Sequence, residues 1–126
     1  MKHIYLIDDD HCCNFLNELV IKSVNPNLQI TSFTKANDAL EEFKKGTLDE
    51  ESIILLDINM PEMNAWEFLI EFEKLVGSNK IIYLLSSSTS VIDRMKALDY
   101  HSVINYLYKP LSSEQFNEIL KAHKKR

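Results

Sequence analysis

Short apolar runs alternate with amphipathic stretches along the chain. Apolar runs stand out at positions 4–7, 53–56, 81–85 and 103–108, and positions 28–33, which contain β-branched and aromatic residues, are a further predicted strand. Continuous apolar runs of this length, bounded by polar turn residues, are typical of strands covered on both faces. Alternation of such strands with helices predicts right-handed crossovers and a parallel sheet with helices on both sides. The predicted fold is therefore a doubly wound α/β sandwich, (βα)5.

The segments between the runs have apolar residues at helical spacing, which predicts one helix after each strand. The residues that define these apolar faces are Cys12, Phe15, Leu16, Leu19 and Val20; Ala36, Ala39, Leu40 and Phe43; Phe68, Leu69, Phe72, Leu75 and Val76; Val91, Met95 and Leu98, which we expect to face inward; and Phe116, Ile119 and Leu120. Gly46 is placed to end the second helix. Ser112 and Gln115 have the spacing of a capping box at the start of the last.

The composition describes one soluble globular domain, expected to span residues 1–126 with no output domain. The net charge of -5, without a basic stripe, argues against direct nucleic-acid binding. Cys12 and Cys13 are adjacent, too close for an ordinary disulfide, so we expect free thiols in a reducing compartment. With no secretory signal or membrane-spanning run, we expect a cytoplasmic protein without membrane contact.

Polar side chains mark the carboxyl ends of four predicted strands. These are Asp8 and Asp9, then Asp57, Ser86 and Lys109. Because parallel strands end at the same edge of the sheet, these groups are expected to converge in one crevice. Each has a simpler interpretation when taken singly: Asp8–Asp10 as a helix cap, Asp57 as a turn former, the serine as part of a polar loop and Lys109 as a surface lysine. Coincidence at four ends of one sheet edge favours a site.

Three carboxylates in one crevice repel each other, and a hard divalent cation relieves this repulsion. Mg²⁺ fits because it binds one or two carboxylates and keeps waters and phosphate oxygens in its shell. A carboxylate nucleophile, a metal, a fixed cation and a hydroxyl donor are the groups needed to transfer a phosphoryl group onto Asp57. The sequence therefore predicts magnesium-dependent phosphoryl chemistry at this edge.

These residues resemble the response-regulator receiver domain of two-component signalling. The matching segments are Leu6–Asp10, Leu56–Pro61, Leu85–Ser87 and Tyr106–Leu111. The resemblance implies the flavodoxin-like strand order 2-1-3-4-5, as in the chemotaxis members of this family. It also implies that the domain catalyses only its own phosphorylation and dephosphorylation, with a histidine kinase or histidine phosphotransfer protein as phosphodonor.

By the same resemblance, each matching residue has an expected role. Asp57 is the phosphoacceptor, and Mg²⁺ is bound by Asp9, Asp57 and the carbonyl of Asn59, with Asp8 acting through water. Lys109 contacts the phosphoryl group and precedes a cis bond to Pro110. Ser86 hydrogen-bonds a phosphoryl oxygen while Tyr106 changes rotamer. The signal then leaves through a downstream protein bound to the face formed by helix 4, strand 5 and helix 5.

The sequence departs from the family pattern at three places. Asn64-Ala65 replaces an Asp-Gly-like pair, Ser86 replaces the commoner Thr, and Asp99-Tyr100-His101 replaces a small-residue segment. Two other functions would use part of the same pattern. One is a receiver-like interaction module that works without phosphorylation, which intact Asp9, Asp57 and Lys109 disfavour. The other is a haloacid-dehalogenase-type hydrolase, whose second aspartate is replaced here by Asn59.

Overall fold

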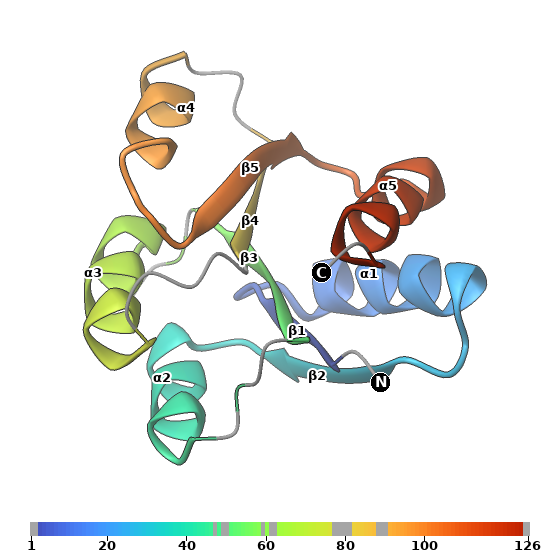
Figure 1. Cartoon of the computed structure of the whole chain (residues 1–126), viewed down its shortest axis with the longest axis horizontal. Helices are drawn as coiled ribbons and strands as arrows, with labels where there is room; N and C mark the ends of the chain where they lie inside the picture. Colours follow the sequence, from blue (N-terminus) through green and yellow to red (C-terminus); the bar gives the residue numbers. More distant parts are fainter. Residues whose placement is uncertain are drawn as a thin grey trace.

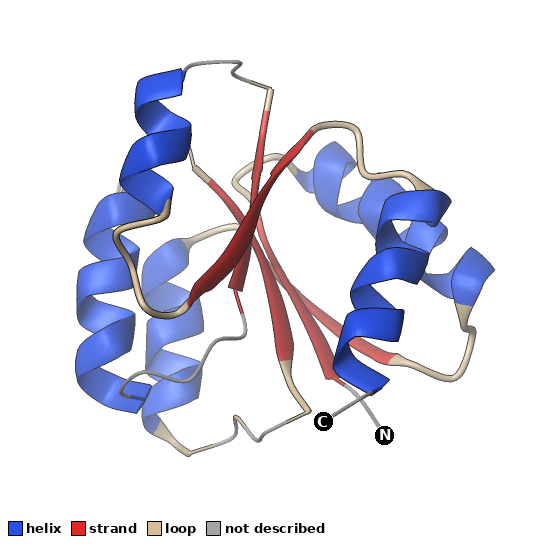
Figure 2. Cartoon of the chain, turned by 45° about the horizontal axis from the view of Figure 1, so that its top comes forward, coloured by secondary structure: helices blue, strands red, loops and turns tan. Residues whose placement is uncertain are grey.

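A computed structural model describes residues 3–46, 48, 51–58, 60, 63–76, 82–87 and 91–124. Its centre is a five-stranded parallel sheet in the order β2-β1-β3-β4-β5, which confirms the predicted fold and strand order. Figure 2 shows the twisted sheet between two layers of helices. The strands are β1 His3–Ile7, β2 Gln29–Phe33, β3 Ile53–Asp57, β4 Ile82–Ser86 and β5 Val103–Tyr108.

The helices cover both faces of the sheet, as the alternation predicted. They are α1 His11–Val24, α2 Ala36–Lys44, α3 Ala65–Val76, α4 Val91–Ala97 and α5 Ser113–Lys124. In Figure 1, α1 and α5 lie on one side and α2, α3 and α4 on the other. No helix in the described part of the chain is both long and apolar enough to cross a membrane.

Each face of the sheet has its own hydrophobic core. Along β3, Ile54 and Leu56 join the core under α2 and α3, whereas Ile53 and Leu55 join the core under α1 and α5. Successive strand side chains point to opposite faces, so a strand buried on both sides needs an unbroken apolar run. This is why the central strands have no polar alternation in the sequence.

Most of the apolar stripe predicted for α1 faces solvent, and of its larger side chains Val20 is the one that packs against the core. Phe15, Leu16 and Leu19 are 61%, 58% and 51% exposed, whereas Asn14 and Ile21 are buried. Asn14 and Ile21 lie on the side of the helix opposite to Phe15 and Leu19. Periodicity located an apolar stripe correctly but could not show that the stripe faces solvent, because the inner face is partly polar.

The prediction that the apolar residues of α4 face inward is also wrong. Val91, Met95 and Leu98 are 68%, 64% and 65% exposed, and Ile92 is 77% exposed. Ala97 is the buried residue of this helix. Because α4 spans only 7 residues, it presents one small side chain to the core and leaves its larger apolar groups outside.

The predicted helix ends are confirmed where the structure describes them. Gly46 follows α2 with a φ of 78°, a left-handed conformation that suits glycine. Ser112 and Gln115 form the expected reciprocal capping box at 3.0 and 3.1 Å. Asn64 forms a second one with Glu67 before α3, and no described residue other than glycine has a positive φ, so Asn64 acts as a cap and not as a left-handed turn.

Candidate functional site

The structure brings the polar strand ends together at one edge of the sheet. Asp8 directly follows β1, Asp57 and Ser86 end β3 and β4, and Lys109 directly follows β5. Carboxylate oxygens of Asp8, Asp9 and Asp57 all lie within 4.8 Å of one another. Asp8 and Asp57 are buried, whereas Asp9 is exposed. The crevice is therefore acidic, and Asp9 lies on its solvent-exposed side.

Lys109 joins two of these carboxylates. Its Nζ lies 2.9 Å from Oδ2 of Asp8 and 3.1 Å from Oδ1 of Asp57. Burial by itself lowers the pKa of Lys109, but the hydrogen bond to Asp8 and the charge of Asp57 outweigh it and raise this pKa above its ordinary value. Lys109 is thus a fixed cation at neutral pH, placed to meet any anion bound beside Asp57.

The acidic turn after β1 is shaped by Asp10. Its carboxylate accepts hydrogen bonds from the backbone N–H groups of Cys12 and Cys13 at 2.8 and 3.4 Å, which caps α1 and lowers the pKa of Asp10. The backbone N–H of Asp10 in turn donates to Oδ1 of Asp8 at 2.9 Å. The helix-cap interpretation of Asp8–Asp10 is therefore right for Asp10, whereas Asp8 and Asp9 belong to the crevice.

The predicted switch residues lie on the next two strands. Ser86 is fully buried, and its carbonyl accepts a 2.8 Å hydrogen bond from the backbone N–H of Lys109. Tyr106 is buried, and its ring centroid lies 5.5 Å from that of Tyr108. The Lys109–Pro110 bond is cis, as the resemblance implied. The main chain thus links the end of β4 to the residue that supplies the cation.

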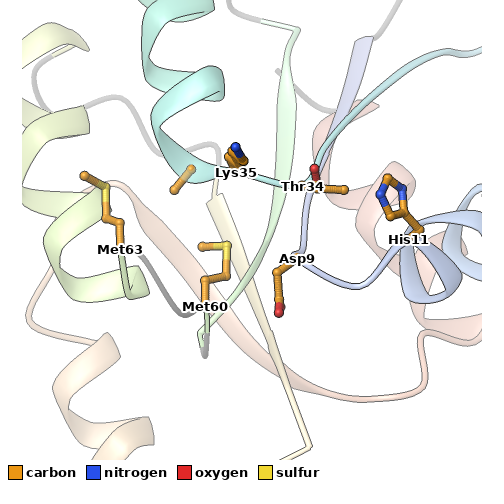
Figure 3. A pocket seen from close by; sticks show the side chains of 7 residues that line it. Asp9, His11, Thr34, Lys35, Met60 and Met63 are labelled. Atoms are coloured by element: carbon orange, nitrogen blue, oxygen red, sulfur yellow. The ribbon is translucent and has the colours of Figure 1, made fainter.

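A pocket of about 250 Å³ is lined on one side by Asp9, the exposed member of the carboxylate cluster (Figure 3). Its walls come from the starts of α1 and α2 and from the segment after β3. The lining residues are Asp9, His11, Thr34, Lys35, Ala36, Met60 and Met63. Asn59, the predicted carbonyl ligand, lies outside the described residues. Three carboxylates and adjacent open space form a hard-oxygen donor set of the kind that Mg²⁺ accepts.

Asn14, on α1, contacts the backbone of Asp8. The sequence pattern did not predict it as a residue of the site. It is 5% exposed, and its Nδ2 donates to the backbone carbonyl of Asp8 at 3.0 Å. Sequence reasoning missed it because it lies outside the apolar stripe of α1. The sequence does show an asparagine one turn after the helix cap, Asp10. Its position in the sequence does not reveal whether its side chain faces the sheet or the solvent.

Comparison with known proteins agrees with this geometry. The family model described as the response regulator receiver domain matches residues 4–121. A two-component response regulator from Cytophaga hutchinsonii has a similar solved structure, with a TM-score of 0.88, 31% identity and coverage of 100% of this chain and 98% of the other. The chain belongs to the response regulator receiver family of two-component signalling.

Two further proteins are similar to this chain. The cell cycle response regulator CtrA of Brucella abortus is 29% identical over 112 residues, which are 89% of this chain and 45% of that protein. The chain therefore spans less than half the length of this curated relative. The response regulator TrrA from Thermotoga maritima, solved in complex with Mg²⁺-BeF, has a TM-score of 0.78 and 23% identity, with coverage of 98% of this chain and 99% of the other.

Proposed function

We propose that this domain transfers a phosphoryl group from a histidine kinase or histidine phosphotransfer protein to its own Asp57, with Mg²⁺ bound at the acidic crevice. The observation that carries the proposal is the buried Asp57 carboxylate, held 3.1 Å from Lys109 and beside two further carboxylates. An Oδ of Asp57 attacks phosphorus, the donor's N–P bond breaks, and the donor imidazole nitrogen takes up a proton.

Asp9, Asp57 and the carbonyl of Asn59 would hold Mg²⁺ directly, and Asp8 would act through a metal-bound water. The ion supplies neutralisation of phosphoryl oxygens and of the crowded carboxylates. Lys109, already protonated, would contact one phosphoryl oxygen, and the Ser86 hydroxyl would donate a hydrogen bond to another. Since phosphoryl transfer depends mainly on positioning and charge neutralisation, these groups suffice without a general base.

The phosphodonor would dock on the exposed apolar residues of α1. Phe15, Leu16 and Leu19 begin one turn from the acidic turn and lie along one side of the helix. An exposed apolar patch beside a reactive carboxylate is typical of a protein-protein contact surface. A donor helix laid along α1 would bring a histidine on that helix to the crevice.

The output surface would be the face of α4, β5 and α5. The exposed side chains of Val91, Ile92 and Met95 make α4 an apolar surface for a downstream partner. Contraction of the Ser86 loop toward the phosphoryl group would give Tyr106 space to change rotamer and would shift this face between two states. We place the domain in the cytoplasm, where its donor and partner would meet it.

Intact-mass spectrometry after incubation with acetyl phosphate tests this function. We expect a phosphoryl adduct on the wild type with Mg²⁺, and none without Mg²⁺ or with Asp57→Asn. The rival function, a receiver-like module that binds partners without phosphorylation, predicts no adduct under conditions that label a known receiver domain. An equal adduct on Asp57→Asn would assign the chemistry to another residue.

A further inference from the structure

Asn14 connects the acidic turn to the neighbouring strand. Its Nδ2 donates to the carbonyl oxygen of Asp8 at 3.0 Å and to that of Phe33, at the end of β2, at 3.3 Å. The backbone N–H of Asp8 also donates to the carbonyl of Phe33, at 3.1 Å. One amide group on α1 therefore ties together the carboxyl ends of β1 and β2.

The orientation of this amide is fixed by its partners. Carbonyl oxygens only accept hydrogen bonds, so the nitrogen of Asn14 must face both of them. This leaves its Oδ1, within the described part of the chain, as a buried side-chain oxygen without a hydrogen-bond partner. An unpaired buried oxygen is destabilising. Stability alone does not explain an asparagine at this position, because an apolar side chain on the buried face of α1 would leave no polar atom unpaired.

Hydrogen bonds hold Asp8, the first residue of the acidic turn, by both its side chain and its backbone carbonyl. Its carboxylate is held by Lys109 and by the N–H of Asp10, while its carbonyl is held by Asn14. Asp9 follows directly and is exposed, and no described cation pairs with it. The path of the backbone through Asp8 is thus what places the Asp9 carboxylate over the crevice.

We propose that Asn14 is a positioning residue for the metal-binding carboxylates, an inference that rests on the proposed function of the crevice. By anchoring the carbonyl of Asp8 to α1 and β2, it sets the separation between the carboxylates of Asp9 and Asp57. Residues that orient metal ligands from outside the coordination sphere typically change metal affinity by 10- to 100-fold when replaced. Asn14 acts through the backbone and contacts neither metal nor phosphoryl group.

The test is a Mg²⁺ titration of the wild type, Asn14→Leu and Asn14→Ala, all at a temperature where each variant is folded. Ile21→Ala is the matched control, because Ile21 is buried on the same face of α1, about two turns beyond Asn14 and so farther from the acidic turn. We expect the Asn14 variants to raise the Kd for Mg²⁺ about tenfold and to be labelled by acetyl phosphate at a near wild-type rate once Mg²⁺ is saturating. An unchanged Kd, or an equal rise in Ile21→Ala, would overturn the proposal.

Amide hydrogen exchange of the metal-free protein separates this inference from the proposed function. We expect faster exchange at the backbone N–H groups of Asp8 and Asp10 in Asn14→Leu, but not in Ile21→Ala. If the wild type fails to bind Mg²⁺, the proposed function falls, whereas this exchange still decides whether Asn14 holds the turn. Unchanged protection at both amides would overturn the positioning role.

Discussion

Lys109 and Asp8 are 101 residues apart in the chain, yet the ammonium nitrogen of one lies 2.9 Å from a carboxylate oxygen of the other. The same nitrogen lies 3.1 Å from Asp57. One cation therefore serves two buried carboxylates, and the third carboxylate, that of Asp9, lies in the same cluster. The lysine stabilises the two buried carboxylates, and the net negative charge that remains favours binding of a further cation.

Removing the lysine charge should destabilise the metal-free protein. In Lys109→Gln, Asp8 and Asp57 stay buried without their cation, and we expect the free energy of unfolding to fall by about 3 kcal/mol. Mg²⁺ should restore part of this loss. Urea unfolding with and without Mg²⁺ measures it, with Lys44→Gln, which breaks an exposed ion pair with Glu41, as the control. Equal stability of Lys109→Gln and wild type would contradict the charge account.

The pH dependence of this contribution follows from the raised pKa of Lys109. A lysine whose folded pKa lies above its unfolded value, about 10.4, stabilises the fold fully below that value. The stabilisation is lost as the pH rises toward the folded pKa. We expect the difference in unfolding free energy between wild type and Lys109→Gln to be constant between about pH 7 and 9. A decline within that window would show that Lys109 titrates there.

Asp9→Asn should have opposite effects with and without metal. In the metal-free protein it removes one of three mutually repelling charges, so we expect the free energy of unfolding to rise by about 1 kcal/mol. With Mg²⁺ the wild type gains stability by binding, and the variant should gain much less. Thermal unfolding across a Mg²⁺ series measures both effects.

Glu71→Gln is the control for Asp9→Asn, because it removes a negative charge from an exposed ion pair with Lys74, away from the crevice. It should leave stability and the Mg²⁺ response near wild type. A lower stability of metal-free Asp9→Asn would contradict the prediction, because it would show that Asp9 is not repelled by Asp8 and Asp57.

The exposed face of α4 can be tested by placing a charge on it. Because Ile92 is 77% exposed, Ile92→Asp should change the free energy of unfolding by no more than about 0.5 kcal/mol. Phe116→Ala, in the core under α5, should lower it by about 3 to 5 kcal/mol. Chemical denaturation compares the two variants. A large loss in Ile92→Asp would mean that α4 packs inward, as its sequence pattern suggested.

Trp66 should report movement of α4. Its ring stacks on Tyr100 with centroids 5.8 Å apart, and Nζ of Lys96 lies 4.9 Å from its centroid. Since the sequence has 1 tryptophan, its fluorescence is specific to this contact between α3 and α4. We expect Mg²⁺ with beryllofluoride, a phosphoryl mimic, to change the emission in the wild type but not in Asp57→Asn. Unchanged emission would exclude a displacement of α4 relative to Trp66.

The sequence was sufficient to predict the sheet and the crevice, because both depend on patterns along single strands. Asp57 ends an unbroken apolar run, and parallel strands bring such ends together whatever their separation in the chain. The capping pair Ser112–Gln115 is likewise a local signal. These features require no knowledge of how the helices are rotated about their axes.

Helix rotation is what the sequence could not provide. On α1 the apolar stripe around Leu16 faces solvent, while buried Asn14 faces the sheet. On α4 the same error arose because an apolar pattern is equally consistent with a core face and a contact face. Stacking of Tyr100 on Trp66 also depends on tertiary packing, although Tyr100 is a departure from the family pattern that the sequence alone shows.

The most direct test of the central claim locates the phosphoryl group within the chain. Borohydride reduces an aspartyl phosphate to homoserine and leaves an ordinary aspartate unchanged, so peptide mapping after acetyl phosphate, Mg²⁺ and borohydride identifies the acceptor. We predict homoserine at position 57 in the wild type and at no position in a sample prepared without Mg²⁺. Homoserine at position 8 or 9, or none at position 57 in a sample that carries the phosphoryl adduct, would contradict the assignment of Asp57.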